Sequence, residues 1–458
     1  MRSKLQKIGL VLFGLVAGIL VSLNFSAVAS KDVTTTLPIE ELRSFADVYN
    51  AIKQGYVEPI DDRKLITHAI SGMLSNLDPH SAYLDADAFK DLQVSTQGEF
   101  GGLGIEVGLE DGFVKVIAPI DDTPAFKAGV KAGDLIIKLD DTPVKGMTLN
   151  DAVKRMRGKP KTQITLTIAR KGEPKPIVMA LTREKIKVQS VKAKMLDAGY
   201  GYVRISQFQE ESAADLVKQL DKLYKQDKDG LRGLVLDLRN DPGGLLNGAV
   251  GVAAAFLPEK ALVVSTDGRS EDAKRKFIAS PEDYLRGSRD DFLKNLPSGV
   301  KTVPLVVLVN GGSASASEIV AGALQDHQRA VVLGTQTFGK ASVQTILPLS
   351  NNTAIKLTTA RYYTPNGRSI QAKGITPDVV VEETANGGTH EQLREADLER
   401  HLENDKEKIA TPKPQTKNGK SEGETESKPA PFELASKNDY QLNQALGLLK
   451  AWQIIQKR

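Results

Sequence analysis

Asn310-Gly-Gly-Ser-Ala-Ser-Ala-Ser-Glu318 joins an apolar run at 303–309 to a second apolar stretch at 318–324. The first run is short and rich in β-branched residues, which predicts a buried strand, whereas the second has the spacing of a helix. A glycine-rich turn from a strand into a helix exposes backbone N–H groups at the helix N-terminus, where negative charge is stabilised. A serine hydroxyl in this turn would therefore lie beside a ready site for an oxyanion.

A serine is a weak nucleophile at neutral pH and needs a base. Lys340 can be that base once its amine is neutral, and burial among apolar groups lowers the pKa of a lysine by several units. The flanking residues 338–343 are mostly apolar or small and favour such a site. Gln344 lies four residues beyond Lys340, so in a strand both side chains would share one face and the amide oxygen could orient the amine.

The residues alone leave the choice of nucleophile open. Ser313, Ser315 and Ser317 are equally eligible by composition. Ser315 and Glu318 also fit a capping box, in which the serine only begins the helix. His80, in an Asp-Pro turn, is expected to be a hydrogen-bonded structural histidine rather than a catalytic base.

Together, the segments 310–319 and 338–344 resemble the catalytic segments of the carboxyl-terminal processing peptidases, a family of serine proteases with a Ser–Lys dyad. The resemblance implies that Ser315 is the nucleophile, Lys340 the general base and Gln344 the residue that orients the lysine. Lys340 follows Ser315 by 25 residues, as the family pattern requires. The resemblance extends over residues 37–382, most of the chain.

Residues 96–184 resemble a PDZ domain, with alternating apolar residues at 112–117 and 163–168 and a helical stretch at 148–157. A PDZ domain holds a terminal carboxylate on successive backbone N–H groups while the peptide adds to a sheet edge. A tight hairpin or bulge would explain the glycines of this loop equally well, but the segment 128–134 lies in the register of a PDZ domain. The resemblance assigns the carboxylate-binding loop to Gly102, Leu103, Gly104 and Ile105.

Predicted strands and helices alternate between residues 185 and 382, at 201–208, 212–224, 233–238 and 247–256. This alternation predicts βαβ units and a sheet covered by helices. The resemblance implies a crotonase-like α/β protease core with an inserted PDZ domain and helical terminal segments. It also implies that Gly243 or Gly244 supplies one N–H of the oxyanion hole and Ala316 the other. A plain tight turn is the alternative for the two glycines.

The composition excludes several classes of function. The chain has 458 residues, 61 basic and 57 acidic, for a net charge of +4, and no cysteine. This mild charge without a basic stripe argues against nucleic acid as a partner. The absence of cysteine excludes disulfides and thiolate chemistry. Because Ser–Lys chemistry requires none, we expect no metal and no organic cofactor.

The two ends of the chain differ from its centre. Basic residues at 2–7, an apolar run at 8–23 and small residues at 27–29 predict a signal peptide over 1–29 and a bacterial periplasmic location, with an uncleaved membrane anchor as the alternative. Residues 30–95 are expected to be helical. Residues 383–436 read as a charged, low-complexity linker with a frayed helix near 390–405, and 437–458 as a C-terminal helix. We expect its apolar stripe to contact a second subunit, which predicts a homo-oligomer formed through the terminal helices.

These features predict a serine endopeptidase that captures the exposed C-termini of protein or peptide substrates with its PDZ domain and cleaves them from that region. An activating adaptor protein is a further expected partner. The alternative is a periplasmic PDZ-type binding or adaptor protein with an inactive hydrolase-like core, and a hydrolase of small esters is a third possibility. The joint presence of Ser315, Lys340 and Gln344 favours the peptidase over the adaptor, and the peptide-binding unit favours it over the esterase.

Overall fold

The computed structural model describes residues 37–110, 112–120, 122–227, 229–287, 290–385, 393–406 and 434–456. The predicted signal peptide and most of the predicted linker therefore lie outside the described residues. Contacts divide the chain into two units, Met1–Ile70 and Ser71–Arg458. Within the described ranges, no helix is both long and apolar enough to cross a membrane.

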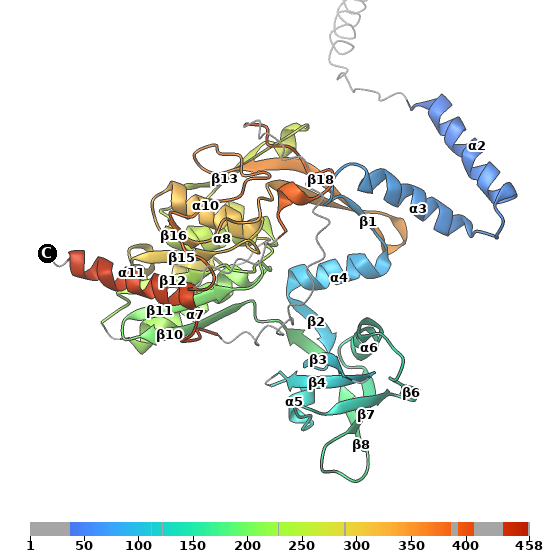
Figure 1. Cartoon of the computed structure of the whole chain (residues 1–458), viewed down its shortest axis with the longest axis horizontal. Coiled ribbons are helices and arrows are strands. Elements are labelled where there is room, and N and C mark those ends of the chain that lie inside the picture. The colour runs from blue at the N-terminus through green and yellow to red at the C-terminus, as the bar shows by residue number, and fades with distance from the viewer. Residues whose placement is uncertain are drawn as a thin grey trace, which may run out of the picture. The chain divides into compact units, whose positions relative to one another are not determined.

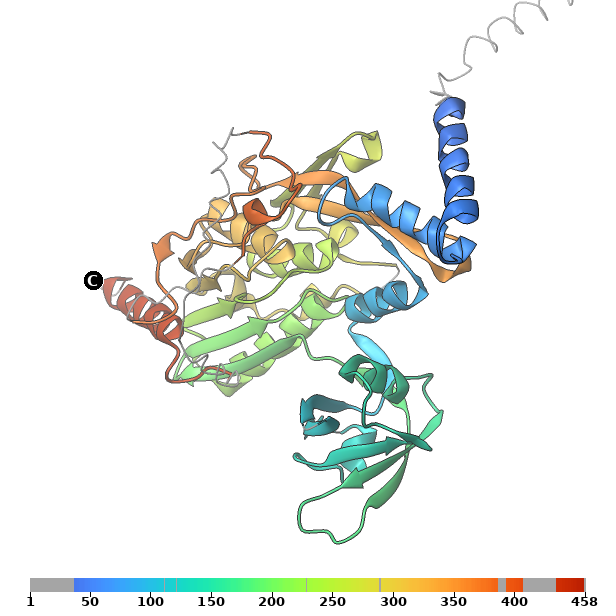
Figure 2. The same ribbon diagram turned by 45° about the vertical axis from the view of Figure 1, so that its right-hand side comes forward.

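The first unit contains two helices, both within the segment 30–95 that was expected to be helical. They are α2 (Ile39–Gly55) and α3 (Asp62–Ser75), whose last residues belong to the second unit (Figure 2). No residue of α2 is buried, and Leu42, Phe45 and Val48 are 49%, 46% and 59% exposed. The apolar stripe of α2 therefore remains largely exposed to solvent in this structure.

Residues 99–187 fold around an antiparallel sheet of order β3-β4-β5-β7-β8, with β6 paired to β5. Alternate residues of β7 point into the core of this unit, where Ile164, Leu166 and Ile168 are at most 2% exposed. Strands β2 and β9 pair where the chain enters and leaves the unit, as expected of an insertion. The elements are β2 (Glu99–Gly102), β3 (Ile105–Glu110), β4 (Phe113–Pro119), α5 (Pro124–Lys127), β5 (Leu135–Leu139), β6 (Thr142–Pro143), α6 (Leu149–Met156), β7 (Gln163–Ala169), β8 (Ile177–Thr182) and β9 (Glu184–Lys187).

The central sheet has the order β10-β11-β12-β15-β16-β19, in which only β10 runs antiparallel to its neighbour. Strands β12 and β15 are buried along their whole length, as expected of a parallel sheet that is covered on both faces. Asp237 pairs with Leu308 at the carboxyl ends of these two strands. The turns that follow them, which contain the predicted oxyanion glycines and the predicted nucleophile, therefore begin side by side. The strands are β10 (Val191–Asp197), β11 (Tyr200–Ile205), β12 (Gly233–Asp237), β15 (Leu305–Val309), β16 (Val331–Gly334) and β19 (Val379–Val380).

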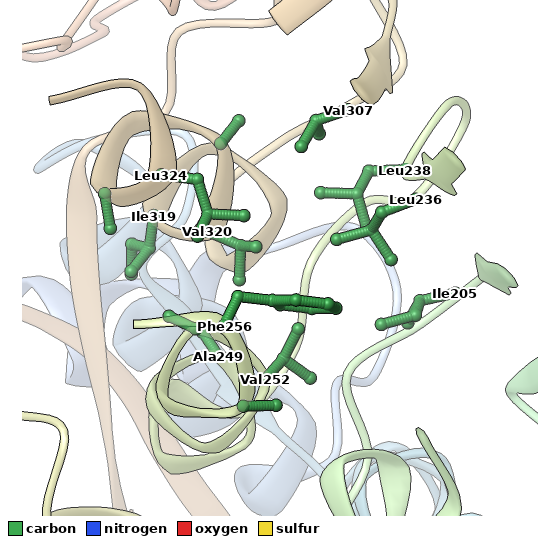
Figure 3. Packing of buried hydrophobic residues seen from close by; sticks show 14 of the residues in the cluster. Ile205, Leu236, Leu238, Ala249, Val252, Phe256, Val307, Ile319, Val320 and Leu324 are labelled. Carbon is green, nitrogen blue, oxygen red and sulfur yellow. The ribbon is translucent and has the colours of Figure 1, made fainter. Parts of the chain in front are cut away.

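Three helices, α7 (Ser212–Gln226), α8 (Leu246–Phe256) and α10 (Ala316–Asp326), cover one face of this sheet (Figure 1). Figure 3 shows Phe256 of α8 in this layer, together with Val320 of α10 and Leu236 of the sheet. Phe256 is 1% exposed and the other two are fully buried. Burial of a large apolar side chain contributes roughly 1.5–3 kcal/mol, so this layer holds the first turn of α10 firmly against the sheet.

A second, antiparallel sheet has the order β1-β18-β13-β14, with β17 paired to β18. Lys340 lies two residues before β17, so this sheet positions the predicted base, whereas the central sheet positions the predicted nucleophile. The strands are β1 (Ala82–Leu84), β13 (Leu262–Gly268), β14 (Arg275–Ile278), β17 (Ser342–Pro348) and β18 (Ala354–Tyr363), with the helices α4 (Ala86–Gln97) and α9 (Pro281–Tyr284) elsewhere in the same unit.

The C-terminal helix α11 (Tyr440–Gln456) packs on the other face of the central sheet (Figure 1). Its residues Leu442, Ala445 and Leu449 are at most 3% exposed and lie in one cluster with side chains of β12 and β15. The helix was predicted correctly. The expectation that its apolar stripe contacts a second subunit was wrong for these three residues, because the sheet of the same chain covers them.

Residues 393–406 differ from the predicted solvated linker. Glu395 is fully buried and its N–H donates to the carbonyl of Phe338 at 3.1 Å. Asn404 is 8% exposed and donates to the carbonyl of Gln371 at 2.9 Å. Where the described residues 393–406 overlap the predicted frayed helix, they form a 3-10 turn, Glu395–Asp397, instead. This segment packs mainly through polar side chains, so apolar spacing gave no sign of it.

Candidate active site

The predicted nucleophile lies where β15 turns into α10. Ser315 is the residue before the helix and has φ 55° and ψ −110°, a backbone conformation that is costly for a residue other than glycine. Ser313 and Ser317 are fully buried, and their hydroxyls donate to the carbonyls of Leu238 and Asp241 at 2.8 and 3.0 Å. Ser315 is only partly buried. The structure thus separates three serines that composition could not distinguish, because two of them hold the turn in place.

Glu318 ties the start of α10 to the segment that carries Lys340. Its carboxylate is fully buried and accepts four hydrogen bonds. The donors are the N–H groups of Ser315 at 2.8 Å, Gly339 at 2.8 Å and Lys340 at 3.0 Å, and the hydroxyl of Thr337 at 2.5 Å. Burial raises the pKa of Glu318 to about 7, although these hydrogen bonds oppose the shift. Ser315 and Glu318 form the predicted capping box, but Glu318 does more than begin a helix.

Tyr362 of β18 makes a second connection between the same two segments. Its hydroxyl lies 3.0 Å from the carbonyl oxygen of Ser315 and 2.5 Å from that of Lys340. The side chain is 1% exposed, so it supports the two backbones from within the core. Glu318 therefore holds the N–H groups of Ser315 and Lys340, and Tyr362 holds their carbonyl groups. Neither contact could be read from the sequence, because β18 and Glu318 meet the Lys340 segment only through the tertiary fold.

The Lys340 amine has the electrostatic environment that a neutral base needs. The pKa of Lys340 is lowered to about 8, mainly by burial and also by the positive charge of Lys356. The negative charges of Glu395, Glu318 and Asp78 oppose this shift. At this pKa about one amine in ten is neutral at pH 7, compared with roughly one in a few thousand for an ordinary lysine. The predicted direction of the shift is confirmed.

The side chains of the predicted dyad are not joined in this structure. Among the hydrogen bonds of the described residues, none links the Ser315 hydroxyl to the Lys340 amine. The Gln344 amide donates to Ser342 at 2.9 Å and Thr358 at 3.2 Å instead of meeting Lys340. Its predicted position on the same face as the lysine assumed one regular strand, but Lys340 precedes β17 and the register shifts between residues 343 and 344.

Of the two glycines after β12, Gly243 lies against the turn of the nucleophile and Gly244 lies against Phe208. A Cβ atom on Gly243, whose φ is +97°, would lie 2.7 Å from the carbonyl oxygen of Ala314 and 2.9 Å from both the nitrogen of Ala316 and the Cβ of Ser315. The N–H of Gly243 donates to the Asp241 carboxyl group at 2.9 Å. The N–H groups of Gly244 and Ala316 have no acceptor among the described residues. Sequence reasoning left both glycines open as the first donor, and this arrangement favours Gly244.

His80 takes part in a buried polar chain that ends beside Lys340. Its Nε2 lies 2.8 Å from Glu395 Oε2, and Gln371 donates from Nε2 to the other oxygen of Glu395 at 2.8 Å. Gln371 Oε1 in turn accepts the N–H of Ala341 at 2.9 Å. This agrees with a structural, hydrogen-bonded histidine, and it shows that residues 393–406 support the segment of the predicted base.

The predicted carboxylate-binding loop joins β2 to β3. Gly102 ends β2, Ile105 begins β3, and β3 is an edge strand of its sheet. The carbonyls of Leu103 and Gly104 accept from Ala125 at 3.0 Å and from the N–H of residue 120 at 2.8 Å, while their N–H groups have no acceptor in the described part of the chain. Gly104 has φ +75°, and a Cβ atom there would lie 2.3–2.4 Å from the side chain of Thr123. This loop therefore requires glycine and offers donors beside an open strand.

Comparison with known proteins relates this arrangement to characterised families. The profile of peptidase family S41 matches residues 199–381, that of the PDZ domain matches 101–181, and that of the activating protease CtpB N-terminal domain matches 21–88. The chain is 46% identical over 444 residues to a carboxy-terminal-processing protease of Bartonella bacilliformis, an alignment that covers 95% of this chain and 94% of that protein. It is 37% identical over 335 residues to the carboxy-terminal processing protease CtpA of Bacillus subtilis, covering 73% and 67% of the two chains. Among solved structures, the photosystem II D1 C-terminal processing protease is 32% identical with a TM-score of 0.41, covering 74% of this chain and 92% of that one.

Proposed function

The chain belongs to peptidase family S41 and is a serine-type carboxyl-terminal processing peptidase with a PDZ domain, and from this premise we propose which of its residues perform the reaction. Ser315 attacks the scissile carbonyl while the neutral amine of Lys340 takes the hydroxyl proton. The N–H groups of Gly244 and Ala316 hold the oxyanion of the tetrahedral intermediate. Lys340 then protonates the leaving amine, and later activates the water that releases the acyl group from Ser315.

The observation that carries this proposal is the shared carboxylate of Glu318. Because the N–H groups of Ser315 and Lys340 meet the same oxygen at 2.8 and 3.0 Å, their nitrogens lie within about 6 Å of each other. In catalysis the Lys340 amine must also reach the Ser315 hydroxyl, and Gln344 would leave Ser342 and Thr358 to orient it. Hydrogen bonds of a catalytic site often tighten only when substrate is bound.

Casein digestion and covalent labelling together test the dyad. We expect Ser315→Ala and Lys340→Ala each to abolish digestion. Ser350→Ala is the control, because this serine is exposed and lies outside the turn of the nucleophile, and we expect it to remain active. A fluorophosphonate probe should label the wild type and the control at Ser315. Digestion by Ser315→Ala at the wild-type rate would show that the assignment of the nucleophile is wrong.

We further propose that the loop of residues 102–105 captures the C-terminal carboxylate of the substrate. Leu103 and Gly104 offer N–H donors at the end of the open edge of β3, where an extended peptide can add as a strand. Fluorescence polarisation should detect a peptide with a free C-terminus and lose at least tenfold in affinity for the same peptide as a C-terminal amide. A Gly104→Ala variant should bind both peptides weakly. Equal binding of the two peptides by the wild type would show that the loop does not recognise the terminal carboxylate.

The location and the assembly of the protein are proposals as well. The pattern of residues 1–29 supports export to the periplasm and cleavage after Ala29, so N-terminal sequencing of the protein from a periplasmic fraction should begin at Ser30. The exposed stripe of α2 supports self-association through the N-terminal helices, and an activating adaptor remains an expected partner. Removal of residues 30–58 should then convert an oligomer into a smaller species in sedimentation experiments.

A further inference from the structure

Asp241 is a buried acidic residue that the reaction scheme does not use. It follows β12 and lies in the turn that leads to Gly243, and its side chain is fully buried. Its Oδ1 accepts the N–H of Gly243 at 2.9 Å. Its carbonyl accepts the N–H of Ala314 and the hydroxyl of Ser317, each at 3.0 Å. One residue thus connects the oxyanion turn to the turn of the nucleophile.

The surroundings of this side chain suit a neutral acid better than a carboxylate. Oδ2 is buried and has no hydrogen-bond partner among the described residues, and an unpartnered buried charge is costly. Arg204 and Arg239 pair with another carboxylate, that of Asp237, at 3.3 and 2.7 Å. Burial raises the pKa of Asp241 to about 8 and the charge of Asp237 acts in the same direction, while the hydrogen bonds from Gly243 and Ser317 and the charge of Arg204 oppose the shift. In the first turn of α10 the titratable group is Glu318, whose oxygens face the Lys340 segment.

The position of Asp241 makes its charge important for catalysis. Gly243, whose N–H it holds, lies close against the Cβ of Ser315 and the nitrogen of Ala316. An ionised Asp241 would therefore place a negative charge close to the oxygen that becomes negative during acyl transfer. In a buried, poorly screened site two such charges oppose each other strongly.

We propose that Asp241 is a positioning residue that supports catalysis only in its protonated form. The neutral carboxyl group holds the Gly243 N–H, which leaves the N–H of Gly244 for the oxyanion, and its ionisation would disfavour the tetrahedral intermediate. This inference rests on the proposed roles of Ser315 and Ala316. It predicts that the alkaline loss of activity belongs to Asp241 and not to Lys340, which becomes a better base as the pH rises.

The test is the pH dependence of kcat/KM for an unstructured peptide between pH 6 and 10, for the wild type and Asp241→Asn. With Lys340 and Asp241 both titrating at about 8, the wild-type profile should be a bell that falls about tenfold per pH unit on each side. Asparagine keeps the acceptor for Gly243 but cannot ionise. The variant should retain the acid limb, lose the alkaline limb and exceed the wild type by about a hundredfold at pH 10.

Two controls make the outcome decisive. Asp221→Asn, on the surface of α7, should give the wild-type bell, and circular dichroism at each pH establishes that the proteins stay folded. If Asp241→Asn does not fold, infrared difference spectra of wild-type protein with 13C-carboxyl-labelled aspartate should show a protonated carboxyl band that disappears around pH 8. An unchanged alkaline limb in the variant, or no such band at pH 7, overturns the inference. If the wild type shows no activity that depends on Ser315, the proposed function is overturned instead.

Discussion

Replacement of Glu318 by glutamine tests whether one buried carboxylate positions both dyad residues. Oε1 accepts from Thr337 and Gly339, and Oε2 accepts from Ser315 and Lys340. Glutamine has almost the same shape but a single acceptor oxygen. With the NH2 group at the Oε2 position, the N–H groups of Ser315 and Lys340 both lose their acceptor. With it at the Oε1 position, the N–H of Gly339 loses its acceptor and the Thr337 hydroxyl must turn to accept.

The size of the effect follows from those lost acceptor contacts. A buried hydrogen bond to a charged acceptor contributes about 1.5–3 kcal/mol, so the loss of one costs about 1.5–3 kcal/mol and the loss of two about 3–6 kcal/mol. Part of this cost lowers stability and part misplaces the reacting groups. We expect Glu318→Gln to lower kcat/KM at least a hundredfold with little change in KM, because the carboxylate contacts no substrate. The melting temperature should fall by several degrees.

Steady-state kinetics on a short peptide, well below the melting temperature of the variant, separates the two parts. The exposed Glu259→Gln should behave as wild type in both measurements. Wild-type kcat/KM in Glu318→Gln, together with a lowered melting temperature, would show that Glu318 supports only the fold. Unchanged values of both quantities would refute the argument from its four hydrogen bonds.

Three further changes probe other contacts of the site. Gly243→Ala should reduce kcat/KM and fluorophosphonate labelling of Ser315 at least tenfold, because its Cβ would enter the space in front of the Ala316 nitrogen; full labelling would contradict this. Lys356→Gln removes a positive charge that lowers the pKa of Lys340, so the acid limb of the kcat/KM profile should move to higher pH, and a shift to lower pH would contradict the cause assigned. Glu395→Gln weakens a buried acceptor of residues 393–406 and should lower the melting temperature by several degrees in calorimetry, whereas an unchanged value would show that this segment adds no stability.

Local sequence patterns predicted most of the elements because their signals are local. The apolar run before Asn310 and the alanine-rich stretch after Gly244 correspond to β15 and α8, and their alternation predicted a parallel sheet with helices on its face. The glycine turn with three serines also indicated where the proposed site lies. Choosing Ser315 from the residues alone was impossible, because Ser313 and Ser317 are excluded only by the carbonyls they contact.

What the sequence did not reveal depends on contacts between distant segments. Tyr362 reads as an ordinary strand residue, and its contact with two carbonyls exists only when β18 lies beside the Lys340 segment. Residues 393–406 are polar and charged, so their composition predicts a solvated linker. Glu395 is nevertheless fully buried, and it contacts His80, which lies 315 residues earlier in the chain. The bulge that displaces Gln344 from the expected face arises from strand pairing, which residue spacing alone does not encode.

The arrangement of these contacts determines how the dyad can be completed. Glu318 and Tyr362 fix the backbones of Ser315 and Lys340 on their N–H and carbonyl sides, so the missing bond between hydroxyl and amine does not require the two segments to move apart or together. Rotation of the Ser315 and Lys340 side chains can bring hydroxyl and amine together, and in the proposed role Gln344 would exchange its partners Ser342 and Thr358. Ordering a lysine side chain costs up to about 2 kcal/mol, which a bound peptide can readily offset. A site built in this way can rest without the bond between hydroxyl and amine and still become active without refolding any strand or helix around it.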